Sequence, residues 1–274
     1  MLRIGQIEYA NVTPIFTALR ARVPEGEYQF IRGVPAQLND LLARGELDLS
    51  PSSSFEFGRS PQRYKLLSSL SISADGPVKS VLLFSRRPIE ELHGATIALT
   101  ADSATSVALL KILLARHYRF RNTFQVTAEP LDTLMERYPA ALLIGDAALK
   151  GAAQQRSDLH VYDLGVIWRE FTGLPFVFAL WIVNRQAVVS HGEEMRLLHQ
   201  RLLAAKEESL ATLPEIAAGC VERSWIGTEE LIDYWRTISY DLTDRHLQGV
   251  ETFFREAVNM GLLPRQPRLE LLYP

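Results

Sequence analysis

Strand patterns and helix patterns alternate over the first 185 residues of the chain, and this alternation constrains the fold more than any other feature. Leu2 to Ile7 alternates apolar and polar side chains, as a strand with one buried face does. Thr13-Pro14 is typical of a helix start, because threonine can cap a helix and proline suits its first turn. Repeated strand–helix units predict an α/β fold with largely parallel sheets.

The same reading continues along the chain and then changes. Further strands are predicted at 28–31, 48–50, 80–85, 96–100, 140–144, 161–164 and 176–183, with helices at 35–44 and 105–117. The strand at 176–183 is uniformly apolar, which is typical of a strand covered on both faces. After Arg185, helical patterns dominate at 193–211, 213–222, 228–238 and 243–260, so the last third is predicted to be helical.

Two long apolar strands, at 80–85 and 176–183, suggest how the units are divided. In one arrangement, residues 1–88 and 176–274 form a first, discontinuous α/β lobe, and residues 89–175 form a second α/β lobe. The two apolar strands then connect the lobes as a hinge, and a ligand cleft lies between them.

Composition excludes several classes of protein. The 29 basic and 32 acidic side chains leave a net charge of −3, so no overall basic field exists for nucleic acid or an anionic membrane surface. The single cysteine cannot form an intrachain disulfide, and no Cys/His cluster has zinc spacing, so no metal is expected. Motifs for dinucleotides, P-loop phosphates and the serine-hydrolase elbow are missing, and no cofactor is expected.

The chain is also expected to be cytoplasmic. Its longest apolar run, 176–183, is far shorter than the roughly 20 residues that span a bilayer. Glu8 and Asn11 interrupt the apolar stretch that a secretory signal would need near the N-terminus.

Two serine-rich turns are the strongest local signals. Ser52-Ser53-Ser54 follows a predicted strand, and Asp102 to Ser106 begins a predicted helix. Unpaired N–H groups at a helix start bind carboxylates or phosphates without a basic side chain, although Ser103 or Thr105 can instead simply cap its own helix. One of these turns falls in each expected lobe, and both lie on loops after strands. The two turns together favour a small anionic ligand bound between the lobes. The candidate residues are Ser53, Ser54, Ser103, Thr105 and Ser106.

Four more side chains are candidates for the same cleft. Asn11 follows the first strand, and Asp146 follows the strand at 140–144. Each of them can instead be a turn residue that bonds to the backbone of its own turn. Ser80 begins the first hinge strand, and Thr172 precedes the second. The six histidines, at 93, 117, 160, 191, 199 and 246, have no partner at catalytic spacing and are interpreted as structural or surface residues.

Short motifs in a fixed order resemble those of a known family. They are Arg3-Ile4-Gly5 through Tyr9-Ala10-Asn11-Val12-Thr13-Pro14, Gly45 to Asp48 leading to Ser52–Ser54, Gly76 to Val81, Ser103 to Ser106, Leu143 to Leu149, and Thr172 to Ala179. On these residues the chain resembles the MqnA/MqnD enzymes of the futalosine route to menaquinone. The resemblance covers most of residues 1–185 and implies a two-lobed fold like that of type II periplasmic binding proteins.

The resemblance also separates two branches of that family. The naphthoate-forming branch carries a His-Glu pair where this chain has Gly145-Asp146. The chain therefore looks like the MqnA branch, which implies a carbon–oxygen lyase that removes water from chorismate to give 3-[(1-carboxyvinyl)oxy]benzoate. In the resemblance, Asn11 falls on the active-site asparagine. Ala10 departs from the larger apolar residue that is common there.

The implied reaction needs orientation, a proton acceptor and help for the leaving hydroxyl. No His or Glu stands out as the base, so a carboxylate of the substrate itself is a candidate acceptor. Two alternatives remain: a 1,4-dihydroxy-6-naphthoate synthase of the same family, and a non-catalytic protein that binds a carboxylate in the same cleft.

Overall fold

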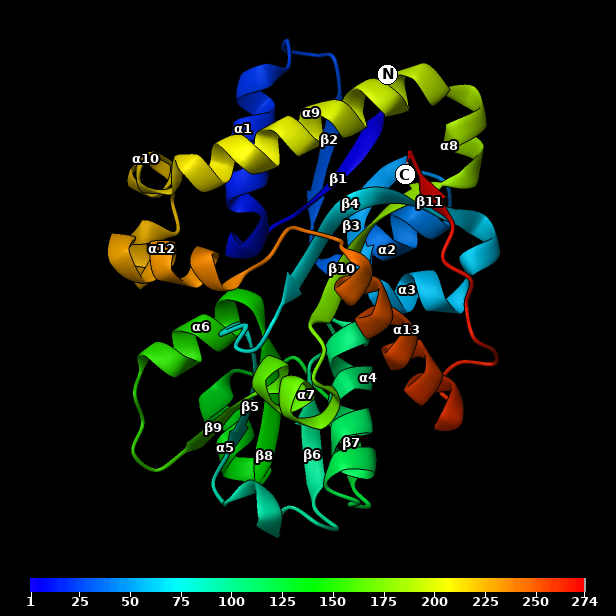
Figure 1. Ribbon diagram of the computed structural model, residues 1–274. Helices are drawn as coiled ribbons and strands as arrows, with labels where there is room; N and C mark the ends of the chain where they lie inside the picture. Colours follow the sequence, from blue (N-terminus) through cyan, green and yellow to red (C-terminus); the bar gives the residue numbers. More distant parts are fainter. Residues whose placement is uncertain (274) are drawn as a thin grey trace.

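The computed structural model describes residues 1–273, which form two α/β lobes stacked one above the other (Figure 1). The upper lobe is built on a six-stranded sheet with the order β11-β4-β10-β3-β1-β2. Its strands are β1 (Arg3–Ile7), β2 (Gln29–Gly33), β3 (Leu49–Ser53), β4 (Tyr64–Ala74), β10 (Phe176–Asn184) and β11 (Leu271–Leu272). The expected strand–helix alternation of the first residues is therefore present, with β1 parallel to both β2 and β3.

The lower lobe is built on a five-stranded sheet with the order β7-β6-β8-β5-β9. Its strands are β5 (Val81–Ser85), β6 (Thr96–Leu99), β7 (Thr123–Val126), β8 (Ala140–Ile144) and β9 (His160–Asp163). Its helices are α4 (Ala104–Ile112), continued by a π-helical turn (Leu113–His117), α5 (Leu131–Arg137), α6 (Gly145–Ala153) and α7 (Leu164–Thr172). A short 3-10 turn, Ile89–Glu91, connects β5 to β6.

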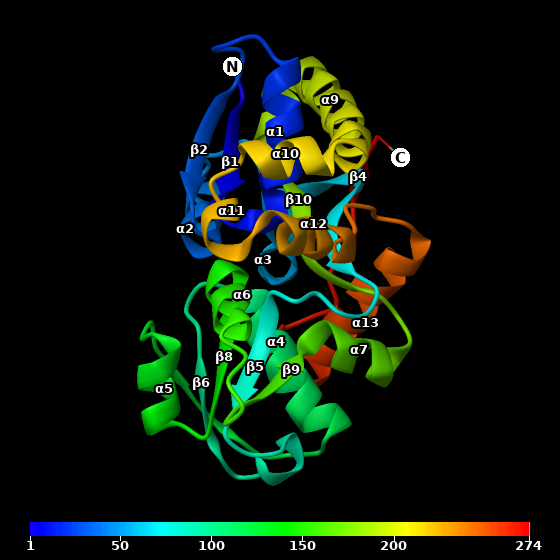
Figure 2. The same ribbon diagram turned by 90° about the vertical axis from the view of Figure 1, so that its left-hand side faces the viewer.

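Helices cover the upper sheet, and most of them come from the last third of the chain. Early helices are α1 (Thr13–Arg22), α2 (Pro35–Ala43) and α3 (Ser54–Arg59), with 3-10 turns η1 (Ala10–Val12) and η2 (Pro61–Arg63). Later ones are α8 (Arg185–Ser190), α9 (Gly192–Ala211), α10 (Leu213–Gly219), α11 (Arg223–Ile226), α12 (Thr228–Thr237) and α13 (Asp244–Asn259). Figure 2 shows α11 and α12 directly above α6 of the lower lobe, with α10 above them. The prediction of a helical C-terminal third is confirmed.

Both sheets are mixed, so the prediction of largely parallel sheets is wrong in part. β10 runs antiparallel to β3 and β4, and β5 runs antiparallel to β8 and β9. Each of these two strands is buried along most of its length, and an apolar run reports burial without reporting the direction of its neighbours.

The sheets also divide the chain differently from the expected ranges 1–88 with 176–274, and 89–175. Val81–Ser85 is a central strand of the lower sheet and not a connection between lobes. The chain leaves the upper sheet after β4 and returns at β10, so residues 75–80 and 173–175 make the crossings. We propose these two short segments as the hinge.

The long strand β4 was missing from the predicted strands because its sequence, YKLLSSLSISA, reads as a serine-rich loop. Its buried serines are satisfied by backbone carbonyls far along the chain: Ser68 donates to Tyr273, Ser71 to Asp241 and Ser73 to Ser239. Those partners lie more than 160 residues away, so no local pattern reveals them. Within residues 1–273, no helix is long and apolar enough to cross a membrane.

Candidate functional site

A cavity lies between the two lobes, at the ends of strands from both sheets. Its enclosed volume is about 60 Å³, so it is a narrow cavity between the lobes. The lining residues are Ile7, Tyr9, Asn11, Pro35, Ser53, Ile72, Val78, Ser80, Val81, Ser103, Ser106, Ile144, Gly145, Phe178, Ala179 and Ile238. The cavity therefore has apolar walls and a few convergent polar groups, as ligand sites commonly do.

Five of the expected site residues line this cavity. Asn11 lies in the turn after β1, Ser53 ends β3, and Ser80 precedes β5. Ser103 and Ser106 lie at the start of α4, in the other lobe. Loops that follow strands and a helix start thus meet at one place, which is where open α/β sheets bind ligands.

Ser103 caps α4 and lines the cavity at the same time. Its Oγ accepts the backbone N–H of Ser106 at 3.1 Å and donates to the Ser106 Oγ at 3.0 Å. The capping interpretation is therefore correct for Ser103, but it does not remove the residue from the cavity. The positive end of the α4 dipole and the two hydroxyls face the same space.

Asn11 contributes an unpaired polar atom. Its Oδ1 is buried and has no hydrogen-bond partner within the described residues, whereas its backbone carbonyl accepts from the Tyr240 hydroxyl at 2.8 Å. A buried acceptor without a donor is rare and costs roughly 1–3 kcal/mol, so such an atom in a cavity marks a place where a ligand can supply the donor.

Ser80 is oriented by a neighbour from the helical third of the chain. The hydroxyl of Tyr234, on α12, donates to the Ser80 Oγ at 2.9 Å. Burial raises the pKa of Tyr234, so this phenol stays protonated and keeps donating at neutral pH. The Ser80 hydroxyl in turn donates to the Val78 carbonyl over a long 3.4 Å.

The other four expected site residues do not line the cavity. The Ser54 Oγ donates to the Val177 carbonyl at 2.7 Å, and the Thr172 Oγ1 donates to the Trp168 carbonyl at 2.9 Å at the end of α7. Thr105 joins the lobes instead: its Oγ1 lies 2.5 Å from the Ser53 Oγ and accepts the Phe55 N–H at 3.0 Å. Asp146 faces a neighbouring groove, where its Oδ1 accepts the Ala10 N–H at 3.0 Å.

Tyr9 and Gly145 form a wall of the cavity that sequence reasoning missed. Gly145 has φ +56°, and a Cβ atom on it would lie 2.9 Å from the Tyr9 ring. Glycine therefore lets the Tyr9 ring of one lobe pack on the backbone of the other. Burial, with the nearby Asp102 and Asp146 carboxylates, raises the pKa of Tyr9. The only local signal was that Tyr9 lies two residues before Asn11.

The cavity lining holds no side chain that is ionised at neutral pH. None of the lining residues is Asp, Glu, Lys, Arg or His. Across residues 1–273, no three or more His, Cys, Asp or Glu side chains are grouped so that they can hold a metal ion. Recognition in this cavity therefore depends on hydroxyls, backbone N–H groups, one amide and shape.

Two lobes joined by two crossing segments, with a polar-ended cavity between them, define the class of periplasmic-binding-protein folds. Three solved structures agree. A protein of Archaeoglobus fulgidus matches with a TM-score of 0.78 at 19% identity, covering 96% of this chain and 98% of that one. The aliphatic sulphonate binding protein of Escherichia coli matches with 0.66 at 15%, covering 100% and 94%. A Candida albicans protein described as having the generic periplasmic binding protein fold matches with 0.62 at 11%, covering 97% and 91%.

Sequence comparison then gives the family. The family model described as menaquinone biosynthesis matches residues 2–259, and the chain belongs to this family. A chorismate dehydratase of Thermus thermophilus is 33% identical over 275 residues, which cover 95% of this chain and 96% of that protein. A chorismate dehydratase of Campylobacter jejuni is 32% identical over 179 residues, 64% of each chain. The expected fold class and family are confirmed.

Replacing Ser106 by alanine is expected to weaken binding of a carboxylate ligand about tenfold or more. A hydrogen bond to a charged group contributes roughly 1.5–3 kcal/mol, and the buried Ser106 hydroxyl lines the cavity at the α4 start. Isothermal titration with chorismate measures the change. Ser190→Ala, on the exposed part of α8, is the matched control. Unchanged affinity in Ser106→Ala would mean that the serine serves only its own helix.

Proposed function

We propose that this protein is a chorismate dehydratase, a hydro-lyase that acts in menaquinone biosynthesis. The observation that carries the proposal is the 33% identity to the Thermus thermophilus chorismate dehydratase, which extends over 95% of the chain. The cavity between the lobes supports it, because its apolar walls and its few convergent polar groups suit a small ligand of this kind.

Chorismate has two carboxylates and a ring hydroxyl, and the cavity offers matching groups. We assign one carboxylate to the start of α4, where Ser103, Ser106 and the helix dipole favour an anion. Ser53 and Ser80 lie in the same lining and are assigned to the second carboxylate. The apolar walls then hold the ring. Because apolar walls lower the local dielectric constant, hydrogen bonds to the charged groups are stronger than they would be in solution.

The reaction breaks one ring C–H bond and one C–O bond. The electrons of the C–H bond form the new ring double bond, the hydroxyl leaves with a proton as water, and the ring becomes aromatic. No carboxylate or imidazole lines the cavity, so we assign the role of proton acceptor to a carboxylate of the substrate. Asn11 has an unpaired Oδ1 for the substrate hydroxyl, while its NH₂ group can donate to the departing oxygen.

Incubating the purified protein with chorismate is expected to produce an aromatic ultraviolet band together with 3-[(1-carboxyvinyl)oxy]benzoate, identified by mass and NMR spectra. Aromatisation provides the driving force, so conversion is expected to run to completion. Heat-denatured protein is the control for spontaneous decay of chorismate. Binding of chorismate without conversion would favour a non-catalytic carboxylate-binding protein, and turnover of another family substrate alone would favour the naphthoate-forming activity.

We further propose that the enzyme acts in the cytoplasm on its small-molecule substrate and does not bind nucleic acid. The net charge of −3 supports the second part, because it provides no overall basic field.

A further inference from the structure

The turn that carries Asn11 begins with an N–H group that has no partner inside the turn. Residues Ala10–Val12 form the 3-10 turn η1, whose first N–H groups have no partner inside the turn. The residue before it, Tyr9, makes no capping hydrogen bond with its side chain, since a tyrosine ring cannot reach back to its own turn. The cap that this turn needs must come from elsewhere in the protein.

Asp146 supplies that cap from the opposite lobe. It lies in the first turn of α6, and its Oδ1 accepts the Ala10 N–H at 3.0 Å across the gap between the lobes. Asp146 is half-buried, and this is the one hydrogen bond of its carboxylate within the described residues. Its side chain thus acts on Ala10 as an N-cap aspartate acts on its own helix, but in trans.

The remaining contacts of the turn come from the lobe to which it belongs. The Ala10 carbonyl accepts from the Trp235 Nε1 at 2.7 Å, and the Asn11 carbonyl accepts from the Tyr240 hydroxyl. These contacts are independent of the lower lobe. The Asp146 bond, with the packing of Gly145 against Tyr9, is what the lower lobe adds to the turn.

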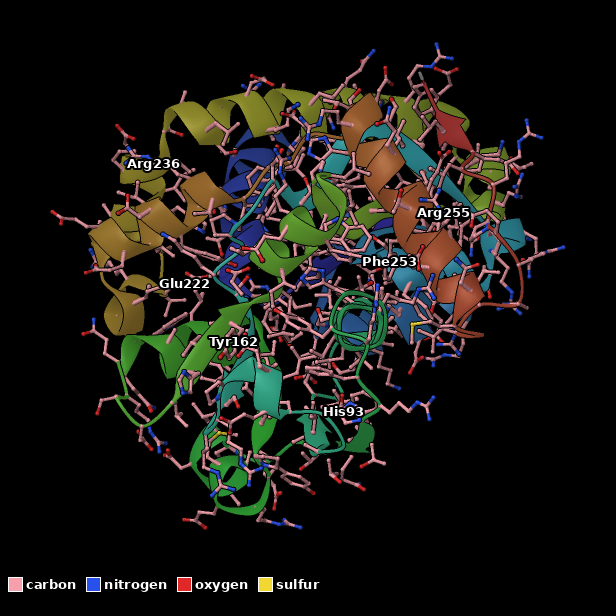
Figure 3. The ribbon with its side chains drawn as sticks, turned by 60° about the horizontal axis from the view of Figure 1, so that its bottom comes forward. His93, Tyr162, Glu222, Arg236, Phe253 and Arg255 are labelled. Atoms are coloured by element: carbon pink, nitrogen blue, oxygen red, sulfur yellow. The ribbon has the colours of Figure 1, made fainter. Side chains whose placement is uncertain are left out.

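Two charged neighbours of Asp146 do not replace this contact. Lys150 lies one turn further along α6, and its Nζ sits over the Trp225 ring at 4.5 Å. Glu222, labelled in Figure 3, lies beside α11, which packs against α6, and repels the Asp146 carboxylate. Within residues 1–273, the Ala10 N–H remains the hydrogen-bond partner of the Asp146 carboxylate.

We propose that Asp146 is a positioning residue that caps the Asn11 turn only when the lobes are closed, so that closure completes the placement of Asn11 against the substrate. The inference rests on the proposed chorismate dehydration in this cavity. It also revises the expectation that Asp146 binds substrate, because the carboxylate faces the turn and lies outside the cavity lining. Lobe closure and the placement of Asn11 are then coupled through this hydrogen bond, together with the packing of Gly145 on Tyr9.

Steady-state kinetics of two Asp146 variants with chorismate test the proposal. Asp146→Ala removes the acceptor and is expected to lower kcat about tenfold or more, with KM changed less than threefold, because the serines that hold the carboxylates remain. Asp146→Asn keeps an acceptor oxygen in the same place and is expected to stay within about threefold of the parent kcat. Asp132→Ala, in the first turn of α5 and away from the upper lobe, is the matched control.

A double-mutant cycle shows whether Asp146 acts through Asn11. Adding Asp146→Ala to Asn11→Ala is expected to lower kcat less than twofold further. In that background the turn no longer carries the asparagine side chain that Asp146 positions. A full tenfold loss in that background, or a tenfold loss in Asp146→Asn, overturns the proposal. The Asn variant decides the matter even if Asp146→Ala folds poorly. Parent protein that does not convert chorismate would instead refute the proposed function.

Discussion

Replacing Asn11 by alanine is expected to lower kcat for chorismate by about 10²–10³-fold, because one preorganised hydrogen-bonding group at a reacting centre typically contributes that much. Asn11→Asp is nearly isosteric, yet it exchanges the donor NH₂ group for an anion that faces an anionic substrate. We expect it to be at least as damaging. Stopped-flow or steady-state assays of aromatic product formation measure both variants.

Stability distinguishes this result from simple unfolding. The Asn11 Oδ1 is buried and has no hydrogen-bond partner among residues 1–273. Its removal in Asn11→Ala relieves an unsatisfied acceptor and is expected to leave the free energy of unfolding unchanged or slightly raised. Asn259→Ala, at the exposed end of α13, is the control for a neutral asparagine substitution. Parent-like turnover in both Asn11 variants would make Asn11 a turn residue only.

Trp235→Ala is expected to lower the free energy of unfolding by about 3–5 kcal/mol, the usual range for truncating a buried aromatic side chain. Trp235 is fully buried on α12, and its Nε1 donates to the Ala10 carbonyl at 2.7 Å. The substitution leaves a cavity and an unpaired carbonyl beside the Asn11 turn, so activity should fall as well. Urea unfolding followed by circular dichroism gives the stability change.

Two further variants separate the contributions of Trp235. Trp235→Phe retains most of the buried ring and loses the hydrogen bond, so we expect a stability loss of about 1–2 kcal/mol. Trp225→Ala, at a half-buried site on α11, is the control and is expected to cost less than Trp235→Ala. A loss below about 1 kcal/mol in Trp235→Ala would contradict the view that α12 anchors the turn.

Local sequence patterns correctly predicted the helices and strands whose ends or burial depend on neighbouring residues in the sequence. The helix at 35–44 begins at a proline and ends before Gly45, and α2 spans Pro35–Ala43. The apolar run at 176–183 corresponds to β10. The strand β4 was missed because its serines are satisfied by the 239–241 segment and by Tyr273, and the direction of β5 depends on neighbours distant in sequence.

The same distinction applies to the candidate site. Ser53, Ser103 and Ser106 follow strands or start a helix, and such positions meet at one edge by topology alone. Thr172 is next to a crossing segment in sequence, but its hydroxyl bonds to the Trp168 carbonyl within α7. Ile238 and Tyr234 needed the tertiary structure, because the helical third of the chain had no pattern that related it to the cavity. Tyr9 needed it because its contact with Gly145 joins two different lobes.

The position of β10 in the upper sheet has a consequence for how the protein is made. β10 lies between β3 and β4, yet it follows them by about a hundred residues, and the whole lower sheet is encoded in between. During synthesis, the lower sheet is complete before β10 leaves the ribosome, while β3 and β4 still have open edges. The upper lobe therefore forms last, by long-range strand insertion. Long-range strand pairing of this kind is intrinsically slow and leaves strand edges exposed to aggregation in the meantime.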